Sequence, residues 1–154
     1  MYRIDDAPTL FPVGPLSEGD GAGGSGCVNE GGALADGIWF GYILSKDSQE
    51  LTFDLACFFF GEVAVVAAAA DGITDVSNDY YVRNMNPLGY YPPYREDAVM
   101  WWLDPSSGDF TPTPMAFLDW PGPTEEWPCP GVHCGVWLYI NDGFITEAFE
   151  QYVP

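Results

Sequence analysis

The stretch that decides the fold is residues 39–60, which read WFGYILSKDSQELTFDLACFFF. Two runs rich in aromatic and aliphatic residues, 39–45 and 51–60, flank a polar segment at residues 46–49. Such runs favour β-strands, and a short polar connection between them predicts a hairpin. Because successive side chains of a strand point to opposite faces, one face of the second run is expected to lie in the core. That face consists of Leu51, Phe53, Leu55, Cys57 and Phe59.

The chain that follows this hairpin predicts one short helix and four more strands. Residues 62–70 place apolar side chains at helical spacing, and Asp71-Gly72 is typical of a helix end. The side chains expected on the buried face of this helix are Val63, Val66, Ala67 and Ala70. Asp142-Gly143 between two apolar runs indicates another hairpin. The further strands are expected at residues 80–84, 98–103, 136–140 and 144–153.

Six short strands and one helix predict a mainly β protein. The favoured architecture is a small, partly open antiparallel barrel of OB or SH3-like size with one short helix, because closure hides the edges of a small sheet. A two-layer α+β sheet is the alternative. Residues 1–16 form an apolar, proline-containing arm, residues 17–33 a glycine-rich linker, and residues 34–154 a single β domain. Within the domain, residues 104–130 hold seven of the fourteen prolines and predict a long surface excursion.

Composition excludes whole classes of partner. The 154 residues include 23 Asp and Glu against 4 Lys and Arg, which gives a formal net charge of -19. Proteins that bind nucleic acid gain much of their affinity from clustered cations, and here the cations are scattered singly, so no nucleic-acid partner is expected. No apolar stretch is long enough for a transmembrane segment. At the same time 47% of the residues are hydrophobic, so the charge is expected to cover a packed core.

Four cysteines, an even number, predict two disulfides and hence an exported protein in an oxidising compartment. Four cysteines allow three pairings, and we expect Cys27 with Cys57 and Cys129 with Cys134. The first bridge would tie the linker to a strand, and the second would close a short loop. A metal site at Cys129, His133 and Cys134 is the rival interpretation, although the chain has no second cluster to complete four ligands.

Several strings of the sequence resemble one family when they are taken as a set. They are WFGY at residues 39–42, LTFDLA at 51–56, NDYYVRN at 78–84 with Asn86-Pro87, and Asp142-Gly143 with EQYVP at 150–154. This set resembles a group of small exported proteins, secreted or of the lipoprotein type, from actinobacteria and other Gram-positive bacteria. The group has no assigned activity. The resemblance therefore implies export and a domain carried on a linker, and it transfers no catalytic residue.

Carboxylates are the weak candidates for catalysis. The single histidine leaves no base for a nucleophilic triad, but glycoside cleavage needs only two suitably placed carboxylates. Glu150 and Asp54 are the candidates for such a small hydrolase. The structural alternative is that Glu150 faces inward on the last strand and pairs with Arg83. On that interpretation Glu150→Gln is expected to lower thermal stability.

Aromatic residues are the candidates for binding, because they exceed what a small barrel can bury and can stack on sugars or grip a protein. The five candidates are Tyr91, Tyr94, Trp102, Trp120 and Trp127. Trp101 and Trp102 are neighbours on a strand, so at most one of the two is expected in the core. No cofactor is expected other than Ca²⁺, for which Asp71 and Asp75, or Asp104 and Asp109, are weak ligand candidates.

Three functions follow from these features. The first is a non-catalytic exported β domain that binds or presents a carbohydrate or protein at the cell surface through its aromatic loops. The second is a structural subunit that self-associates, with residues 1–16 adding to the sheet of a neighbour. The third is the carboxylate-based glycoside hydrolase.

Overall fold

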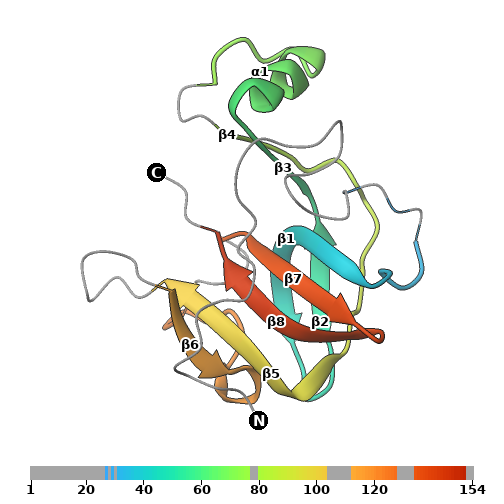
Figure 1. The fold of residues 1–154 in the computed structure, drawn as a ribbon, viewed down its shortest axis with the longest axis vertical. Helices are drawn as coiled ribbons and strands as arrows, with labels where there is room; N and C mark the ends of the chain where they lie inside the picture. The colour runs from blue at the N-terminus through green and yellow to red at the C-terminus, as the bar shows by residue number, and fades with distance from the viewer. Residues whose placement is uncertain are drawn as a thin grey trace.

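The computed structural model describes residues 27, 29, 31–76, 80–103, 112–127 and 134–151. Within these residues the protein is mainly β with one α-helix, which confirms the fold class expected from the sequence (Figure 1). The elements are β1 (Gly37–Lys46), β2 (Leu51–Leu55), β3 (Cys57–Phe60), α1 (Gly61–Ala70), β4 (Tyr80–Arg83), β5 (Tyr94–Leu103), β6 (Pro112–Ala116), the short 3-10 helix η2 (Phe117–Asp119), β7 (Val136–Asn141) and β8 (Phe144–Glu150).

Six strands form one sheet in the order β2-β1-β7-β8-β5-β6, and this sheet is not closed into a barrel. All neighbouring strands are antiparallel except β5 and β8, which run parallel. The outer edge of β2 is nonetheless covered, because Phe53 and Tyr90 exchange two backbone hydrogen bonds. The two expected hairpins are present. In the second of them Asp142 and Gly143 both have positive φ, as the turn requires.

The apolar run at residues 51–60, which was expected to be one strand, divides into two strands. Residues 51–55 belong to the six-stranded sheet, whereas residues 57–60 pair with β4 in a separate two-stranded sheet. The break falls at Ala56, whose N–H still donates to the carbonyl of Phe40, the next residue in the β1–β2 register, before the chain leaves this sheet. Together β3, α1 and β4 form a unit, here called the lobe, which lies at the top of Figure 1. The division creates a junction between the lobe and the larger sheet.

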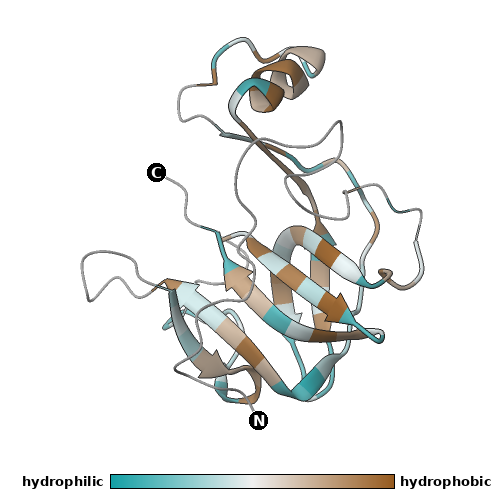
Figure 2. Cartoon of the chain, viewed as in Figure 1, coloured by the Kyte–Doolittle hydropathy of each residue, from teal (hydrophilic) through white to brown (hydrophobic). Residues whose placement is uncertain are grey.

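Both faces of the six-stranded sheet are buried, and each has its own core. On one face aliphatic side chains predominate, among them Ile43, Leu55 and Leu138. On the other face aromatic side chains pack against the lobe, and Trp137 and Phe149 lie among them. Figure 2 shows this division as alternating hydropathy along β7, because Trp and Tyr score as less hydrophobic than Val, Leu and Ile.

The structure corrects two expectations about packing. The helix buries Ala64, Ala67 and Ala68, whereas Val66, which was expected to be buried, is 70% exposed. Small alanines let α1 approach the two-stranded sheet of β3 and β4 closely, and this contact determines which face of the helix is buried. In the excursion expected at residues 104–130, the described residues include strand β6 and the fully buried side chains of Phe117 and Trp120, so this part is not a surface loop.

Candidate functional site

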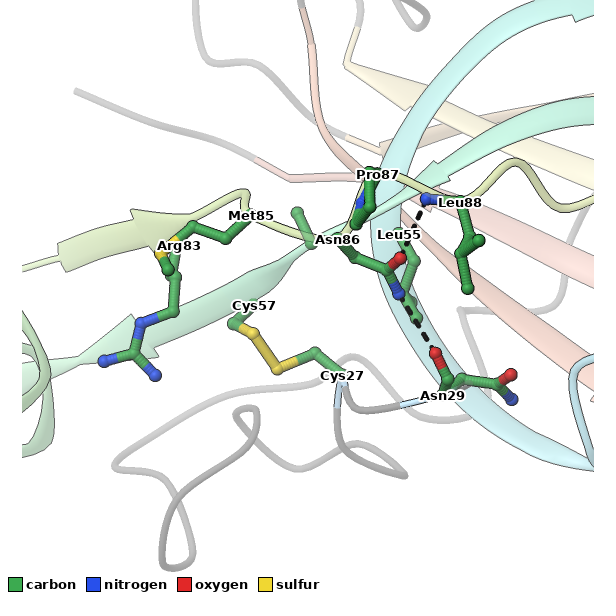
Figure 3. Close-up of a pocket in the computed structure, with 10 residues that line it drawn as sticks. Cys27, Asn29, Leu55, Cys57, Arg83, Met85, Asn86, Pro87 and Leu88 are labelled. Atoms are coloured by element: carbon green, nitrogen blue, oxygen red, sulfur yellow. Dashed lines mark hydrogen bonds between the residues drawn. A yellow bond between two sulfur atoms is a disulfide. The ribbon is translucent and has the colours of Figure 1, made fainter. Parts of the chain in front are cut away.

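A pocket lies at the junction between the lobe and the six-stranded sheet (Figure 3). Its volume is about 510 Å³. The disulfide between Cys27 and Cys57 lines it together with Leu55 and Ala56, so most of this surface is apolar. This bridge confirms the first of the two expected cysteine pairs. The bridge fixes residue 27 against the first residue of β3 and so makes the pocket wall part of the folded core.

The opposite wall of the pocket is held by a small network of hydrogen bonds. The side-chain amide of Asn86 donates to the hydroxyl oxygen of Tyr90 at 2.9 Å and to the carbonyl of Asn29 at 3.3 Å. The Tyr90 hydroxyl itself donates to the Asn29 carbonyl at 2.7 Å. In addition, the Asn86 side-chain oxygen accepts the N–H of Leu88 at 2.9 Å. Because Tyr90 is buried, this network anchors the wall to the core rather than to a surface loop.

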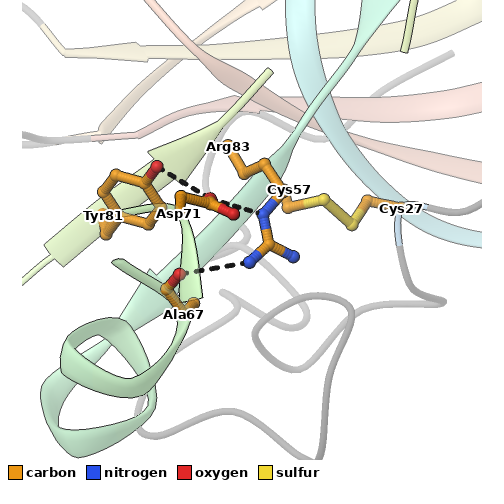
Figure 4. Close-up of polar contacts among 6 residues, drawn as sticks. All are labelled: Cys27, Cys57, Ala67, Asp71, Tyr81 and Arg83. Carbon is orange, nitrogen blue, oxygen red and sulfur yellow. Dashed lines mark hydrogen bonds and ion pairs between the residues drawn. A yellow bond between two sulfur atoms is a disulfide. The ribbon is translucent and has the colours of Figure 1, made fainter. Parts of the chain in front are cut away.

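Arg83 lines the side of the pocket nearest the helix and is already paired (Figure 4). Its Nε donates to the carboxylate of Asp71 at 2.8 Å, and its Nη2 donates to the carbonyl of Ala67 at 3.2 Å. The Tyr81 hydroxyl donates to the same carboxylate at 2.9 Å. The hydrogen bond from Arg83 and then that from Tyr81 lower the pKa of Asp71 below its ordinary value. This network holds the end of α1 against β4.

The network around Arg83 corrects one expectation and involves one of the Ca²⁺ candidates. The expected ion pair between Arg83 and Glu150 is wrong, because Arg83 bonds to Asp71 while Glu150 accepts the N–H of Leu103 at 2.9 Å. Asp71, one of the weak Ca²⁺ candidates, accepts hydrogen bonds from Arg83 and Tyr81, and the described residues contain no cluster of three or more potential metal ligands. Asp104 and Asp109 lie outside the described residues.

Two large apolar side chains stand exposed at the pocket. Met85 is 72% exposed and Leu88 is 41% exposed, and both belong to the pocket lining. Neither residue was identified from the sequence. The only signal there was Asn86-Pro87, which stood out as part of a resemblance and not as part of a site. An irregular segment has no periodicity that would reveal which of its side chains stay exposed.

The five aromatic residues expected to bind a ligand do not form one surface. Trp120 and Tyr94 are buried, and the Tyr94 hydroxyl donates to the carbonyl of Asp47. The indole N–H of Trp120 has no hydrogen-bond partner among the described residues. Tyr91 is 59% exposed and lines a separate pocket of about 350 Å³.

Trp102 and Trp127 pack edge to face, with ring centroids 5.3 Å apart and planes inclined at 61°, and both lie against the aliphatic core. In this arrangement the edge of one ring points at the face of the other, so the pair offers no flat two-ring platform. Trp102 is half-buried and Trp101 is buried, which confirms that only one of these neighbours is in the core.

The structure does not bring Asp54 and Glu150 together. Glu150 on β8 is the register partner of Val136 on β7, which pairs with Gly41 on β1, which in turn pairs with Leu55 on β2. Three strand spacings therefore separate Glu150 from β2. At about 4.8 Å a spacing, this distance is roughly 14 Å, beyond the separation of the two carboxyl groups in glycosidases. Asp54 is the neighbour of Leu55 and therefore points to the other face of the sheet.

Glu150 gives a testable pH dependence. The side chain is buried, and burial raises its pKa above the ordinary value of 4.5, although the hydrogen bond from Leu103 acts in the opposite direction. A raised pKa in the folded state means that the contribution of Glu150 to stability is full below pH 4.5 and is lost as the pH rises through the folded-state pKa.

We therefore expect Glu150→Gln to match the native protein near pH 4 and to be more stable by about 1 kcal/mol at pH 7, because the amide still accepts the Leu103 N–H without a buried charge. This reverses the expectation from the sequence, which rested on the ion pair with Arg83. Urea denaturation at both pH values measures the difference. A variant that is less stable at pH 7 would show that Glu150 has a cationic partner in solution.

Cys134 is disulfide-bonded, while Cys129, its expected partner, and His133 lie outside the described residues. No helix in the described ranges has the length and apolar character needed to cross a membrane.

Comparison of the chain with protein-family models, with curated proteins and with solved structures finds no match. The family resemblance seen in the sequence therefore stays a prediction.

Proposed function

We propose that this protein is a non-catalytic, exported binding domain that takes an apolar side chain of a protein partner into the pocket beside the disulfide. The observation that carries the proposal is the pocket of about 510 Å³, with exposed Met85 and Leu88 at its lining. This volume falls within the range of ligand pockets in proteins. Exposed methionine is typical of surfaces that adapt to apolar partners.

The charge of the protein specifies the kind of partner. With a net charge of -19, the chain attracts basic proteins over distances of about a Debye length and repels acidic ones. The expected ligand is therefore an apolar side chain flanked by Lys or Arg. The disulfide supports an oxidising, exported setting for this encounter.

Chemistry in the pocket favours binding over catalysis. The described residues that line it include no carboxylate and no histidine, and both cysteines are joined in the disulfide. Arg83 is the only ionisable side chain among them, and its hydrogen bonds go to Asp71 and Ala67. The cavity is mostly apolar, its lining is fixed, and its one cation already donates hydrogen bonds within the protein. Such a cavity can hold an apolar group but offers no general acid or base.

A random peptide library displayed against the immobilised full chain tests the proposal. We expect enriched peptides to combine an apolar residue with neighbouring Lys or Arg. The double variant Met85→Ser/Leu88→Ser should bind them about tenfold more weakly, because apolar contacts are lost. Both side chains are exposed, so the free energy of unfolding should stay within about 0.5 kcal/mol of the native value.

The matched control is Val65→Ser/Val66→Ser on α1, where two exposed valines are lost outside the pocket lining. This control should keep the affinity of the native protein. Equal binding of the enriched peptides to all three proteins, or no enrichment of apolar and basic sequences, would overturn the proposed function.

A further inference from the structure

Another pocket, of about 290 Å³, is lined by residues from the opposite face of the lobe together with Phe40 and Tyr42 of β1. Register pairs Cys57 with Arg83 and Phe58 with Val82. Because successive side chains alternate, Cys57 and Arg83 line the disulfide pocket, whereas Phe58 and Val82 line the second one. The two pockets therefore have separate linings, and a substitution can affect one without the other.

Four aromatic rings from both sheets form a continuous series in this second pocket, here called the aromatic pocket. The rings of Phe58 and Tyr80 are stacked, with centroids 5.4 Å apart and planes inclined at 4°. Phe40 lies 4.9 Å from Phe58 and 5.8 Å from Tyr42, measured between ring centroids. Phe40 and Phe58 are buried, whereas Tyr42 and Tyr80 are half-buried, so the tyrosines remain accessible to a ligand.

Gly135 is part of what makes this arrangement possible. A Cβ at this position would collide with Cζ of Phe40, so only glycine lets that ring lie against the backbone at the start of β7. The ring of Phe40 then also packs against Trp137, at 5.2 Å between centroids. The aromatic pocket is thus built on rings fixed by the core.

Negative charge lies beside the tyrosines. Asp54 is the register partner of Tyr42, and its carboxylate accepts a hydrogen bond from the Asn84 side chain at 2.8 Å. Burial first, and then Tyr80 and Asp54, raise the pKa of Tyr42, as expected where phenol and carboxylate oxygens lie near one another.

The cations in the described part of the chain are engaged elsewhere. Lys46 donates to the carbonyls of Leu118 and Trp120, Arg83 pairs with Asp71, and Arg95 pairs with Asp97. None of these three supplies the positive charge that the aromatic pocket and Asp54 would attract.

We propose that the aromatic pocket binds a small quaternary ammonium ion. The faces of aromatic rings carry negative potential and attract a cation, while the methyl groups of such an ion also gain apolar contact. A quaternary ammonium ion has no N–H to satisfy, which suits a lining made mainly of phenylalanine, valine and tyrosine side chains. The side chain of Gln151 also lines the pocket, and its Oε1 accepts the indole N–H of Trp137 at 2.7 Å. Asp54 and the net charge of -19 add attraction at longer range.

Titration of the isotope-labelled full chain with choline chloride, followed by NMR, tests the proposal. Choline is expected to give saturable shifts at Phe40, Tyr42 and Tyr80, whereas its neutral isostere 3,3-dimethylbutan-1-ol is not. Asp54→Asn and Tyr80→Leu should each weaken choline binding by about fivefold or more. Tyr80→Phe keeps the ring and should keep the affinity. Raising the ionic strength should weaken binding by screening the charges.

Tyr91→Leu, which removes an exposed tyrosine from another pocket, serves as the matched control and should not change the affinity for choline. Equal binding of the neutral alcohol would show an apolar cavity without cation selectivity and would overturn the inference. Absence of saturable shifts would overturn it as well, as would unchanged affinity in both Asp54→Asn and Tyr80→Leu. None of these outcomes bears on the disulfide pocket, because Met85 and Leu88 lie outside the aromatic pocket.

Discussion

Replacing Cys27 and Cys57 together by alanine is expected to lower the free energy of unfolding by about 3–4 kcal/mol. The bridge joins residues 30 positions apart and encloses β1 and β2 in its loop. In the chain-entropy account the loss arises because the unfolded chain gains the freedom that this closed loop removes. Both half-cystines are also buried, so their removal leaves poorer packing in the aromatic core.

Urea denaturation followed by fluorescence measures this change as a lower midpoint. Reduction of the native protein is not an equivalent test, since Cys134 is disulfide-bonded as well and would be released too. The double alanine variant in oxidising buffer isolates the bridge at the pocket. A loss below about 1 kcal/mol would mean that the unfolded chain is already compact around this loop.

Comparing the double alanine variant with Met85→Ser/Leu88→Ser distinguishes the effect of the shape of the pocket from the effect of its contacts with a ligand. Alanine at both positions removes part of the lining as well as the tether on residue 27, so peptide binding and stability should fall together. Met85→Ser/Leu88→Ser should reduce peptide binding alone, because these side chains are exposed and outside both cores. The comparison shows whether the disulfide contributes to recognition through the shape that it stabilises.

Much of the fold was predictable because the strands carry strong local patterns. The hairpin of β1 and β2 follows from two apolar runs around a polar turn, where Asp47 accepts the N–H groups of Gln49 and Glu50. Asp142-Gly143 has the same local character. In such segments the information that specifies the structure lies within a few residues, so the sequence alone reveals it.

The features that the sequence did not reveal depend on contacts between distant segments. The parallel pairing of β5 and β8 and the change of sheet at Ala56 have no local signature. Strand β6 contains Pro112 and Pro114, which obscure a strand pattern and are tolerated because β6 lies at the edge of the sheet. The helix has apolar side chains all round, so the face that packs is selected by the partner surface.

The candidate site illustrates the same limit. The sequence indicated that Arg83, Asp54 and the aromatic residues matter, but it could not tell which residues they meet. Arg83 meets Asp71 across the lobe rather than Glu150, and Asp54 lies beside Tyr42 rather than beside a second carboxylate. Partner choice for a side chain depends on sheet order and register, which are properties of the whole fold.

Gly41→Ala is expected to destabilise the protein by about 3 kcal/mol or more, the upper part of the range for overpacking a core. Gly41 is buried and lies opposite Leu55 in the β1–β2 pair, and a Cβ there would collide with the backbone carbonyl oxygen of Asp54 and lie 2.6 Å from Cζ of Phe53. Relief would require β1 and β2 to separate. The same ladder holds Asp54 beside Tyr42, so the aromatic pocket would also be distorted.

Gly61→Ala is the matched control for this variant. Gly61 has φ of +56°, but a Cβ there meets no heavy atom within 4 Å, so the expected cost is limited to the roughly 1 kcal/mol of left-handed strain. A second test uses Phe53→Leu, which removes the flexible neighbour of Gly41 but not the carbonyl of Asp54. Phe53 is fully buried, so Phe53→Leu is itself destabilising, and the cost of Gly41→Ala is measured against that single variant. If Gly41→Ala cost much less in the Phe53→Leu background than in the native chain, the ring and not the strand backbone would be the obstacle. If it costs as much in both, the close approach of two backbones is what requires glycine at this position.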